Sequence, residues 1–389
     1  MTEQPPRIMR PAIAALEGSR IRQVADANLG REDVIALWFG EPDLPTPDFI
    51  KRAVEQALHD DHVFYAQNRG IPPLRDTIAD YSTKLIGREI GIDRITVSAS
   101  GMSGIMLVSQ ALVDNGDNVL IVGPLWPNCA GTVEVMGGEA RDVSLKPDET
   151  GRWHLDMNDI ADACDERTRA VYVNSPGNPT GWVMEEDQQR ELLAFARERG
   201  IYVVSDEVYV RLIYDRPRAP SFLDIAGPDD RVLVINSFSK SWSMTGWRLG
   251  WLTHPADLGP VFSKLNEFNV ASPTTFVQHA GVVALRDGEP FVADMVERYR
   301  WNRDLVFQRL AAMPKVTLAR PEGAFYAFFA VDGMTDSVAY AKQLIADTGV
   351  GMAPGRAFGP SGEGWLRLCF ASNTNTLSAA LDRLEPVFS

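Results

Sequence analysis

One stretch, residues 232–240, reads Val-Leu-Val-Ile-Asn-Ser-Phe-Ser-Lys. Its apolar first half predicts a buried strand, which delivers Lys240 into a turn rich in serine and glycine. A lysine at the end of a buried strand needs a partner, because an unpaired ammonium is rarely buried. The hydroxyls of Ser237 and Ser239 and the nearby guanidinium of Arg248 make a dianionic phosphate a natural partner.

A lysine beside a phosphate site is typical of a cofactor bound as a Schiff base. Pyridoxal 5'-phosphate fits: Lys240 would be its covalent handle, and Ser237, Ser239 and Arg248 would hold its phosphate. The alternative is a solvated lysine in a surface loop. Other strand ends decide between the two, because ligands of open α/β sheets bind beyond the carboxyl ends of the strands.

Three further predicted strands run into polar groups. Residues 118–122 are followed by Gly-Pro-Leu-Trp126-Pro, and residues 170–173 by Asn-Ser-Pro-Gly-Asn178-Pro-Thr-Gly. Residues 201–205 are followed by Asp206-Glu-Val-Tyr209. The Asp206 carboxylate suits the protonated ring nitrogen, Tyr209 and Asn178 suit the phenolate oxygen, and Trp126 suits stacking on the ring. Singly, these residues have plainer explanations as a helix cap, core aromatics and a turn. Agreement at four strand ends favours the cofactor site.

A glycine-rich helix start provides a second phosphate contact. Residues 95–98 are strand-like, and an apolar helical run follows Ser100. Free amides at a helix N-terminus bind phosphate. The backbone N–H groups of Gly101 and Met102 and the Ser100 hydroxyl are therefore expected to complete the phosphate site.

From about Ser19 to the C-terminus, the chain resembles the class I and II aminotransferases of pyridoxal-phosphate-dependent fold type I. The matching motifs are Ser237-Phe-Ser-Lys-Ser, Met244-Thr-Gly-Trp-Arg-Leu-Gly, Asn178-Pro-Thr-Gly, Gly40-Glu-Pro-Asp with Thr46-Pro, Tyr65, Pro321-Glu-Gly-Ala-Phe-Tyr, Pro354-Gly-Arg-Ala-Phe-Gly and Trp365-Leu-Arg-Leu. The resemblance implies that Arg367 binds the substrate α-carboxylate with Asn178 and the Gly40 backbone. It also implies that Tyr65 reaches the phosphate of the partner subunit's cofactor, in a homodimer with shared active sites.

The element pattern predicts an α/β fold with a mostly parallel mixed sheet and a smaller α+β part. Strands and helices alternate through the large cofactor-binding domain, expected at residues 45–285. The expected helices at 291–313 and 337–348 and strands at 316–319 and 325–331 belong to a small domain, residues 286–389. The resemblance adds residues 13–44 to it and leaves residues 1–12 as an N-terminal arm.

Composition limits the partners of this chain of 389 residues. Its net charge of −14 argues against nucleic acid and anionic membranes. The first residues lack an apolar signal stretch and no long apolar segment follows, so a cytoplasmic protein is expected. Three scattered cysteines and five histidines without ligand spacing imply no metal site.

The expected reaction is transfer of an amino group from an L-amino acid to a 2-oxo acid by a ping-pong mechanism, with Lys240 as general base once released from the cofactor. Met102 in the phosphate cup and the lack of arginine in residues 267–273 favour apolar, aromatic or broad donors. Aspartate or glutamate stays open, with Lys264 and Arg356 as candidate cations. A different pyridoxal-phosphate reaction, such as β-elimination, also stays open, as does a regulator without catalysis, which would need a DNA-binding module before Ser19.

Overall fold

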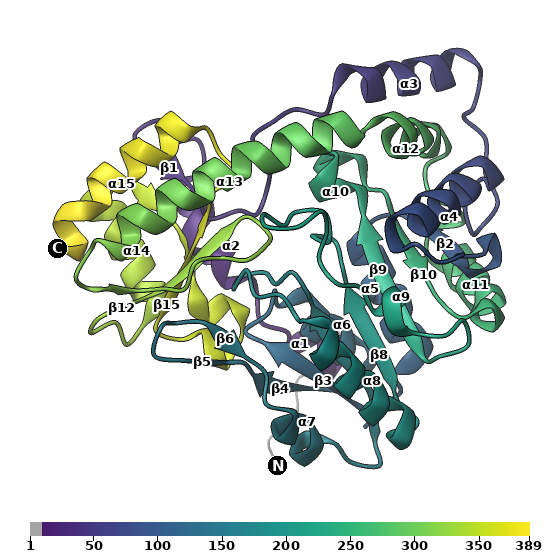
Figure 1. The fold of residues 1–389 in the computed structure, drawn as a ribbon, viewed down its shortest axis with the longest axis horizontal. Helices are drawn as coiled ribbons and strands as arrows, with labels where there is room; N and C mark the ends of the chain where they lie inside the picture. Colours follow the sequence, from purple (N-terminus) through teal and green to yellow (C-terminus); the bar gives the residue numbers. More distant parts are fainter. Residues whose placement is uncertain (1–9) are drawn as a thin grey trace, which may run out of the picture.

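The predicted mostly parallel sheet is a seven-stranded sheet in the computed structural model, which describes residues 10–389 (Figure 1). In spatial order its strands are β2 (Ile95–Ser98), β10 (Gly250–Thr253), β9 (Val232–Ser237), β8 (Tyr202–Asp206), β7 (Thr168–Asn174), β3 (Asn118–Gly123) and β4 (Glu139–Ser144). β10 runs antiparallel to both neighbours, and the other pairings are parallel. The predicted α/β class is confirmed.

Helices cover both faces of this sheet, which is why its central strands are apolar along their whole length. One face packs on α5 (Gly101–Leu112), α6 (Asn128–Met136) and α11 (Gly259–Val270). The other packs on α4 (Pro72–Ile86), α8 (Glu186–Arg199), α9 (Phe222–Ile225) and α12 (Thr275–Asp287). Successive residues of β7 and β8 alternate between these two apolar cores, so the strand period decides which side chains share a face.

A second, four-stranded sheet lies beside the first (Figure 1). Its strands, in spatial order, are β11 (Val316–Thr317), β12 (Tyr326–Val331), β15 (Trp365–Cys369) and β14 (Ala353–Pro354), all antiparallel. The helices around it are α13 (Glu289–Ala311), α14 (Ser337–Thr348) and α15 (Thr374–Phe388), and α13 runs across towards the larger sheet.

The N-terminal part of the chain joins this second unit. β1 (Ile35–Ala36) pairs in parallel with β13 (Val350–Gly351), and α2 (Arg20–Ala25) packs on β14 and α14. The first nine residues of the expected arm lie outside the described range. The domain bounds at 13–44, 45–285 and 286–389 stay a prediction.

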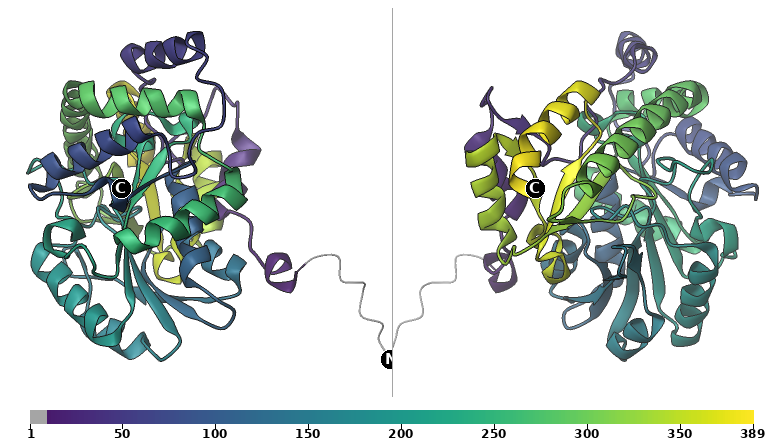
Figure 2. Two further views of the ribbon diagram at one scale, coloured as in Figure 1. Left: turned by 90° about the vertical axis from the view of Figure 1, so that its right-hand side faces the viewer. Right: turned by 60° about the vertical axis from the view of Figure 1, so that its left-hand side comes forward.

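The remaining elements are short or peripheral. They are α1 (Pro11–Ala14), η1 (Asp26–Asn28), α3 (Asp48–His59), η2 (Ile92–Arg94), β5 (Lys146–Pro147), β6 (Trp153–His154), α7 (Met157–Ala163), α10 (Phe238–Ser241), η3 (Thr245–Trp247), η4 (Ala256–Leu258), η5 (Gly355–Phe358) and η6 (Pro360–Gly362). α3 packs on α12 and projects from the body (Figure 2). Among residues 10–389, no helix is both long enough and apolar enough to cross a membrane.

Several expected elements differ in their bounds from the structure; the strand expected at 316–319, for example, covers only Val316–Thr317. Lys240 stands on the short helix α10 and not in a turn, because the Ser237 hydroxyl accepts a hydrogen bond from the Ser239 amide and caps a helical turn. The long helix begins at Glu289, two residues before the expected start, since Pro290 occupies a first-turn position that favours proline.

Candidate active site

The amine of Lys240 lies where the two sheets meet. Its Nζ donates a hydrogen bond to the Gly40 carbonyl oxygen at 2.6 Å, and it lies 5.9 Å from the ring centroid of Tyr209 and 5.7 Å from that of Phe325. Burial lowers the pKa of Lys240 to about 8. Near neutral pH, part of this amine is therefore neutral and nucleophilic, as a Schiff-base lysine requires.

Asp206 ends β8 as a buried carboxylate with few partners. The Tyr172 hydroxyl donates to its Oδ2 at 2.8 Å, and the Val208 amide donates to its Oδ1 at 3.3 Å. Burial raises the pKa of Asp206 to about 6, and the hydrogen bond from Tyr172 opposes this shift. Residues 208–211 form a turn, so Asp206 does not cap a helix.

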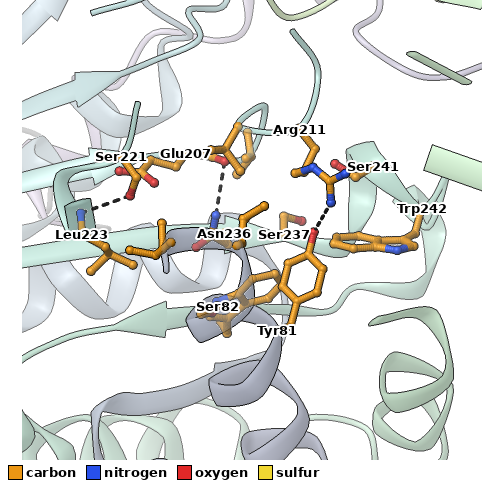
Figure 3. A pocket seen from close by; sticks show the side chains of 15 residues that line it. Tyr81, Ser82, Glu207, Arg211, Ser221, Leu223, Asn236, Ser237, Ser241 and Trp242 are labelled. Atoms are coloured by element: carbon orange, nitrogen blue, oxygen red, sulfur yellow. Dashed lines mark hydrogen bonds between the residues drawn. The ribbon is translucent and has the colours of Figure 1, made fainter. Parts of the chain in front are cut away.

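A second buried carboxylate, Glu207, is already satisfied. Its Oε1 accepts hydrogen bonds from the Ser205 hydroxyl at 2.9 Å and the Phe222 amide at 3.0 Å. Figure 3 shows Glu207 in a small pocket near Ser221, where its backbone carbonyl accepts a hydrogen bond from the side-chain Nδ2 of Asn236. Burial raises the pKa of Glu207 to about 7. Ser205, Ser221 and Phe222 already provide donors to the Glu207 carboxylate, so Asp206 is the one of the two that has an oxygen left for a ligand.

Arg367 is a buried guanidinium without a carboxylate partner among the described residues. Its guanidinium donates to Asn178 Oδ1 at 2.9 Å and to the Trp38 carbonyl oxygen, and lies 4.5 Å and 4.8 Å from the ring centroids of Tyr326 and Phe358. The side chain is 2% exposed, and its Nε has no hydrogen-bond partner. Within residues 10–389 no carboxylate pairs with it. A buried guanidinium of this kind fits a carboxylate ligand.

Tyr209 and Tyr326 share a hydrogen bond of 2.8 Å between their hydroxyls, in the buried space next to Lys240. A side chain at Gly40 would collide with the Tyr326 ring, 2.9 Å from its Cζ, so this position requires glycine. Sequence reasoning quoted the motif that contains Tyr326 but gave the residue no role. Tyr326 is the contact that joins Tyr209, the N-terminal segment at Gly40 and the guanidinium of Arg367.

The expected phosphate ligands gather at the ends of β9 and α5. Ser237 Oγ donates to Ser239 Oγ at 3.0 Å, and the Gly101 backbone packs directly against the Ser237 side chain. Arg248 adopts a left-handed backbone conformation, φ 54°, and its guanidinium donates to the Thr245 carbonyl oxygen at 2.6 Å. The two serines and the helix start are therefore together, whereas the Arg248 side chain is directed at its own turn.

Of the remaining expected cofactor contacts, Met102 and Trp126 line an open cavity, and Ser100 caps the adjoining helix. The Ser100 hydroxyl accepts a hydrogen bond from the Ser103 backbone N–H at 2.9 Å and caps α5, and the side-chain Nδ2 of Asn128 donates to the Met102 sulfur at 3.4 Å. The lining of the same cavity also includes the charged residues Glu17, Arg20, Asp142 and Arg356.

Tyr65 is apart from these residues in the described chain. It is 90% exposed, next to Phe64 at 77%, and Phe268 is 85% exposed. The Thr275 hydroxyl donates to the Phe64 carbonyl oxygen at 2.6 Å and the Ala66 amide to the Ser272 hydroxyl, so these bonds fix the loop that presents Tyr65. Large apolar side chains are seldom left this exposed without a partner surface.

Comparisons with known proteins agree with this geometry. The family model described as aminotransferase class I and II matches residues 32–384. The chain is 32% identical to an aspartate aminotransferase of Pyrococcus horikoshii, over 99% of this chain and 98% of that one. It is 33% identical to aromatic-amino-acid aminotransferase 2 of Thermococcus litoralis, over 95% of each chain. The crystal structure of the Thermotoga maritima aspartate aminotransferase superposes with a TM-score of 0.91 at 33% identity, covering 97% of this chain and 99% of that one.

The residues present fit pyridoxal 5'-phosphate. A partly neutral lysine, a buried carboxylate whose Oδ1 accepts only one long hydrogen bond, and a helix N-terminus beside two serines would supply an amine, an acceptor for the ring nitrogen and a phosphate cradle. The guanidinium of Arg367, whose Nε has no hydrogen-bond partner among the described residues, fits the carboxylate of an amino or oxo acid. The chain belongs to the class I and II aminotransferases, enzymes that use pyridoxal 5'-phosphate to transfer amino groups to 2-oxo acids.

Proposed function

We propose that this aminotransferase prefers apolar or aromatic L-amino acids as donors and works as a cytoplasmic homodimer. The buried guanidinium of Arg367, without a carboxylate partner, is the observation that supports amino-acid binding most directly. Three unpaired cysteines agree with a reducing compartment.

The roles proposed for the chain follow from its donors and acceptors. Bound pyridoxal 5'-phosphate supplies an electron sink for the substrate Cα. Lys240 would bind the cofactor covalently and, once displaced, would take the proton from Cα of the donor and, in the second half-reaction, deliver one to Cα of the product amino acid. Asp206 keeps the proton on the ring nitrogen. Tyr209 and the Asn178 side-chain NH₂ donate to the phenolate oxygen, since the Oδ1 of Asn178 is occupied by Arg367.

The other residues bind and orient. Arg367, with Asn178 and the Gly40 N–H, holds the substrate α-carboxylate and thereby directs the Cα–H bond at the amine of Lys240. Trp126 covers one face of the ring. The phosphate is held by backbone and side-chain donors of Ser100, Gly101, Met102, Ser237, Ser239 and Arg248, and by Tyr65 of the partner subunit.

The substrate preference rests on the cavity beyond Trp126. Met102 lines it, and residues 267–273 contain no arginine. Lys264 is not among the lining residues, so it is a poor candidate for a distal carboxylate. A distal carboxylate buried without a cation would cost several kcal/mol, whereas each buried CH₂ contributes about 0.8 kcal/mol.

Recognition of aspartate or glutamate is the second candidate function, because Arg356 lines the same cavity and makes no ion pair within the described chain. Several relatives are named aspartate aminotransferases and others are named for aromatic or diaminopimelate substrates. The names of these relatives therefore do not indicate which amino donor this chain uses.

The specificity prediction is that leucine, methionine and phenylalanine exceed aspartate in kcat/KM. A donor scan by visible absorption, followed by steady-state assays with 2-oxoglutarate, measures it. A preference for aspartate or glutamate of more than about 100-fold, or about 2.7 kcal/mol in transition-state binding, contradicts the proposal. In that case Arg356→Met should abolish the preference and Lys264→Met should leave it unchanged.

Lys240→Ala is expected to abolish the yellow Schiff-base absorption and transamination. Bound cofactor should persist through its phosphate contacts, so loss of binding is not required. The exposed Lys84→Ala on α4 is the control and should keep both the absorption band and activity. Substantial activity in Lys240→Ala would refute the assignment of the amine.

Asp206→Asn should lower kcat by orders of magnitude and yet stabilise the cofactor-free protein above pH 6. Since the folded-state pKa is raised from 3.8 to about 6, the folded state holds its proton more tightly than the unfolded chain. The free energy of unfolding of the wild-type protein therefore falls by about 3 kcal/mol as the pH rises from about 4 to 6, and Asp206→Asn should not show this loss. Urea unfolding of the cofactor-free proteins across this range measures the difference.

The exposed Asp229→Asn is the control for that experiment. The free energy of unfolding of Asp206→Asn, measured relative to wild type, should increase as the pH rises from about 4 to 6. The difference between Asp229→Asn and wild type should stay constant over the same range. A normal kcat in Asp206→Asn would exclude Asp206 as the ring-nitrogen partner.

The cross-subunit role of Tyr65 predicts a difference between two hybrid dimers. When Tyr65→Phe and Lys240→Ala lie on different subunits, the one active site receives a normal Tyr65 and should bind the cofactor normally. When both substitutions lie on one subunit, the surviving site receives the altered residue and should bind more weakly. The reverse order in measured cofactor affinity would show that Tyr65 serves its own subunit.

A further inference from the structure

The Oδ2 oxygen of Asp206 accepts a hydrogen bond from a residue that has no role in the reaction proposed for this site. The hydroxyl of Tyr172, on the interior strand β7, donates to Asp206 Oδ2 at 2.8 Å. Both residues are buried, at 3% and 6% exposure. Asp206 Oδ1 receives only the longer bond from the Val208 amide, 3.3 Å.

The sheet register explains how these side chains meet. Tyr172 of β7 is opposite Val204 of β8, and Asn174 is opposite Asp206. Because side chains alternate between faces, Tyr172, Val204 and Asp206 all lie on the face covered by α5 and α6. Tyr172 and Asp206 are diagonal neighbours on that face, a separation that a tyrosine spans and a shorter side chain does not.

The surroundings make the tyrosine a donor and hold it in place. On its other side the hydroxyl contacts the thiol of Cys129 on α6, which is 2% exposed. A thiol is a weak acceptor, so the hydroxyl proton is directed to the carboxylate. Burial raises the pKa of Tyr172 well above 10, so the hydroxyl keeps this proton.

We propose that Tyr172 is a positioning residue that fixes the Asp206 carboxylate, with Oδ1 directed at the ring nitrogen of the cofactor. This inference rests on the role proposed for Asp206. A carboxylate offers about four acceptor positions, and a single strong donor on Oδ2 fixes the plane of the group. The weakly bonded Oδ1 is thereby left for the ring N–H.

The same hydrogen bond stabilises the charged form of Asp206. Its donor opposes the effect of burial, which favours the neutral acid. A neutral acid would not hold a proton on the ring nitrogen. Tyr172 therefore contributes both the orientation and the charge of the group on which the electron sink depends.

The test is Tyr172→Phe, which removes one oxygen and keeps the packing. The expected result is a kcat lower by about 10-fold or more, since hydrogen bonds to charged groups are the stronger class. The ¹⁵N NMR signal of bound, ring-labelled pyridoxal 5'-phosphate should shift towards the unprotonated form. Tyr202→Phe, at the other end of β8, is the matched control and should change neither.

A cofactor analogue with CH in place of the ring nitrogen separates positioning from general packing. Tyr172→Phe should weaken binding of pyridoxal 5'-phosphate and leave binding of the analogue unchanged, because the analogue makes no bond to Asp206. Equal weakening of both would overturn the proposal and leave Tyr172 a structural residue. An unchanged ¹⁵N signal in Tyr172→Phe would also overturn it.

Two further variants keep the outcomes distinct. Replacement of Tyr172 by 4-aminophenylalanine, which retains an N–H donor, should restore the ¹⁵N signal, and failure to do so contradicts the proposal. The double variant Tyr172→Phe with Asp206→Asn should be no slower than Asp206→Asn alone. If Asp206→Asn itself leaves the ¹⁵N signal unchanged, the role proposed for Asp206 fails and the inference fails with it.

Discussion

The structure depends on keeping three ionisable groups, Lys240, Asp206 and Arg367, out of water without letting them neutralise one another. Burial of a charge is costly unless a partner or a set of hydrogen bonds offsets it. Here the lysine meets a backbone carbonyl, the aspartate a tyrosine hydroxyl, and the arginine an amide oxygen and two aromatic faces. Each receives polar contacts but not an opposite charge, so each stays available to a ligand.

Maintaining that state requires contributions from distant parts of the chain. Parallel pairing of β7, β8 and β9 brings their carboxyl ends together, which places Asp206 near the helix that carries Lys240. The guanidinium arrives on β15 of the other sheet, and the carbonyls of Trp38 and Gly40 arrive on the segment after β1. The site is therefore shared between two sheets, and its geometry follows from how they pack.

The sequence was sufficient for the parts of the site that depend on local patterns. Apolar runs in the sequence predict where strands end, so the side chains of Asn178, Asp206 and Lys240 could be assigned to one end of a sheet. Side-chain contacts between the two sheets cannot be predicted from such local patterns. Tyr326 sits within a motif but meets Tyr209 only in the folded state, and Tyr172 looks like an ordinary core residue in an apolar strand.

The single reversed strand of the large sheet constrains where the chain can change length. β10 returns between β2 and β9, so Gly250 pairs with Ser237 at the same end of the sheet. A parallel return would need a crossover of about a dozen residues or more and would start at the opposite end. Insertions between Lys240 and Gly250 would therefore act at the end of the sheet that carries Ser237 and Lys240, whereas loops at the amino ends of the strands lie at the opposite end. Attempts to graft new segments or split the chain should use those loops.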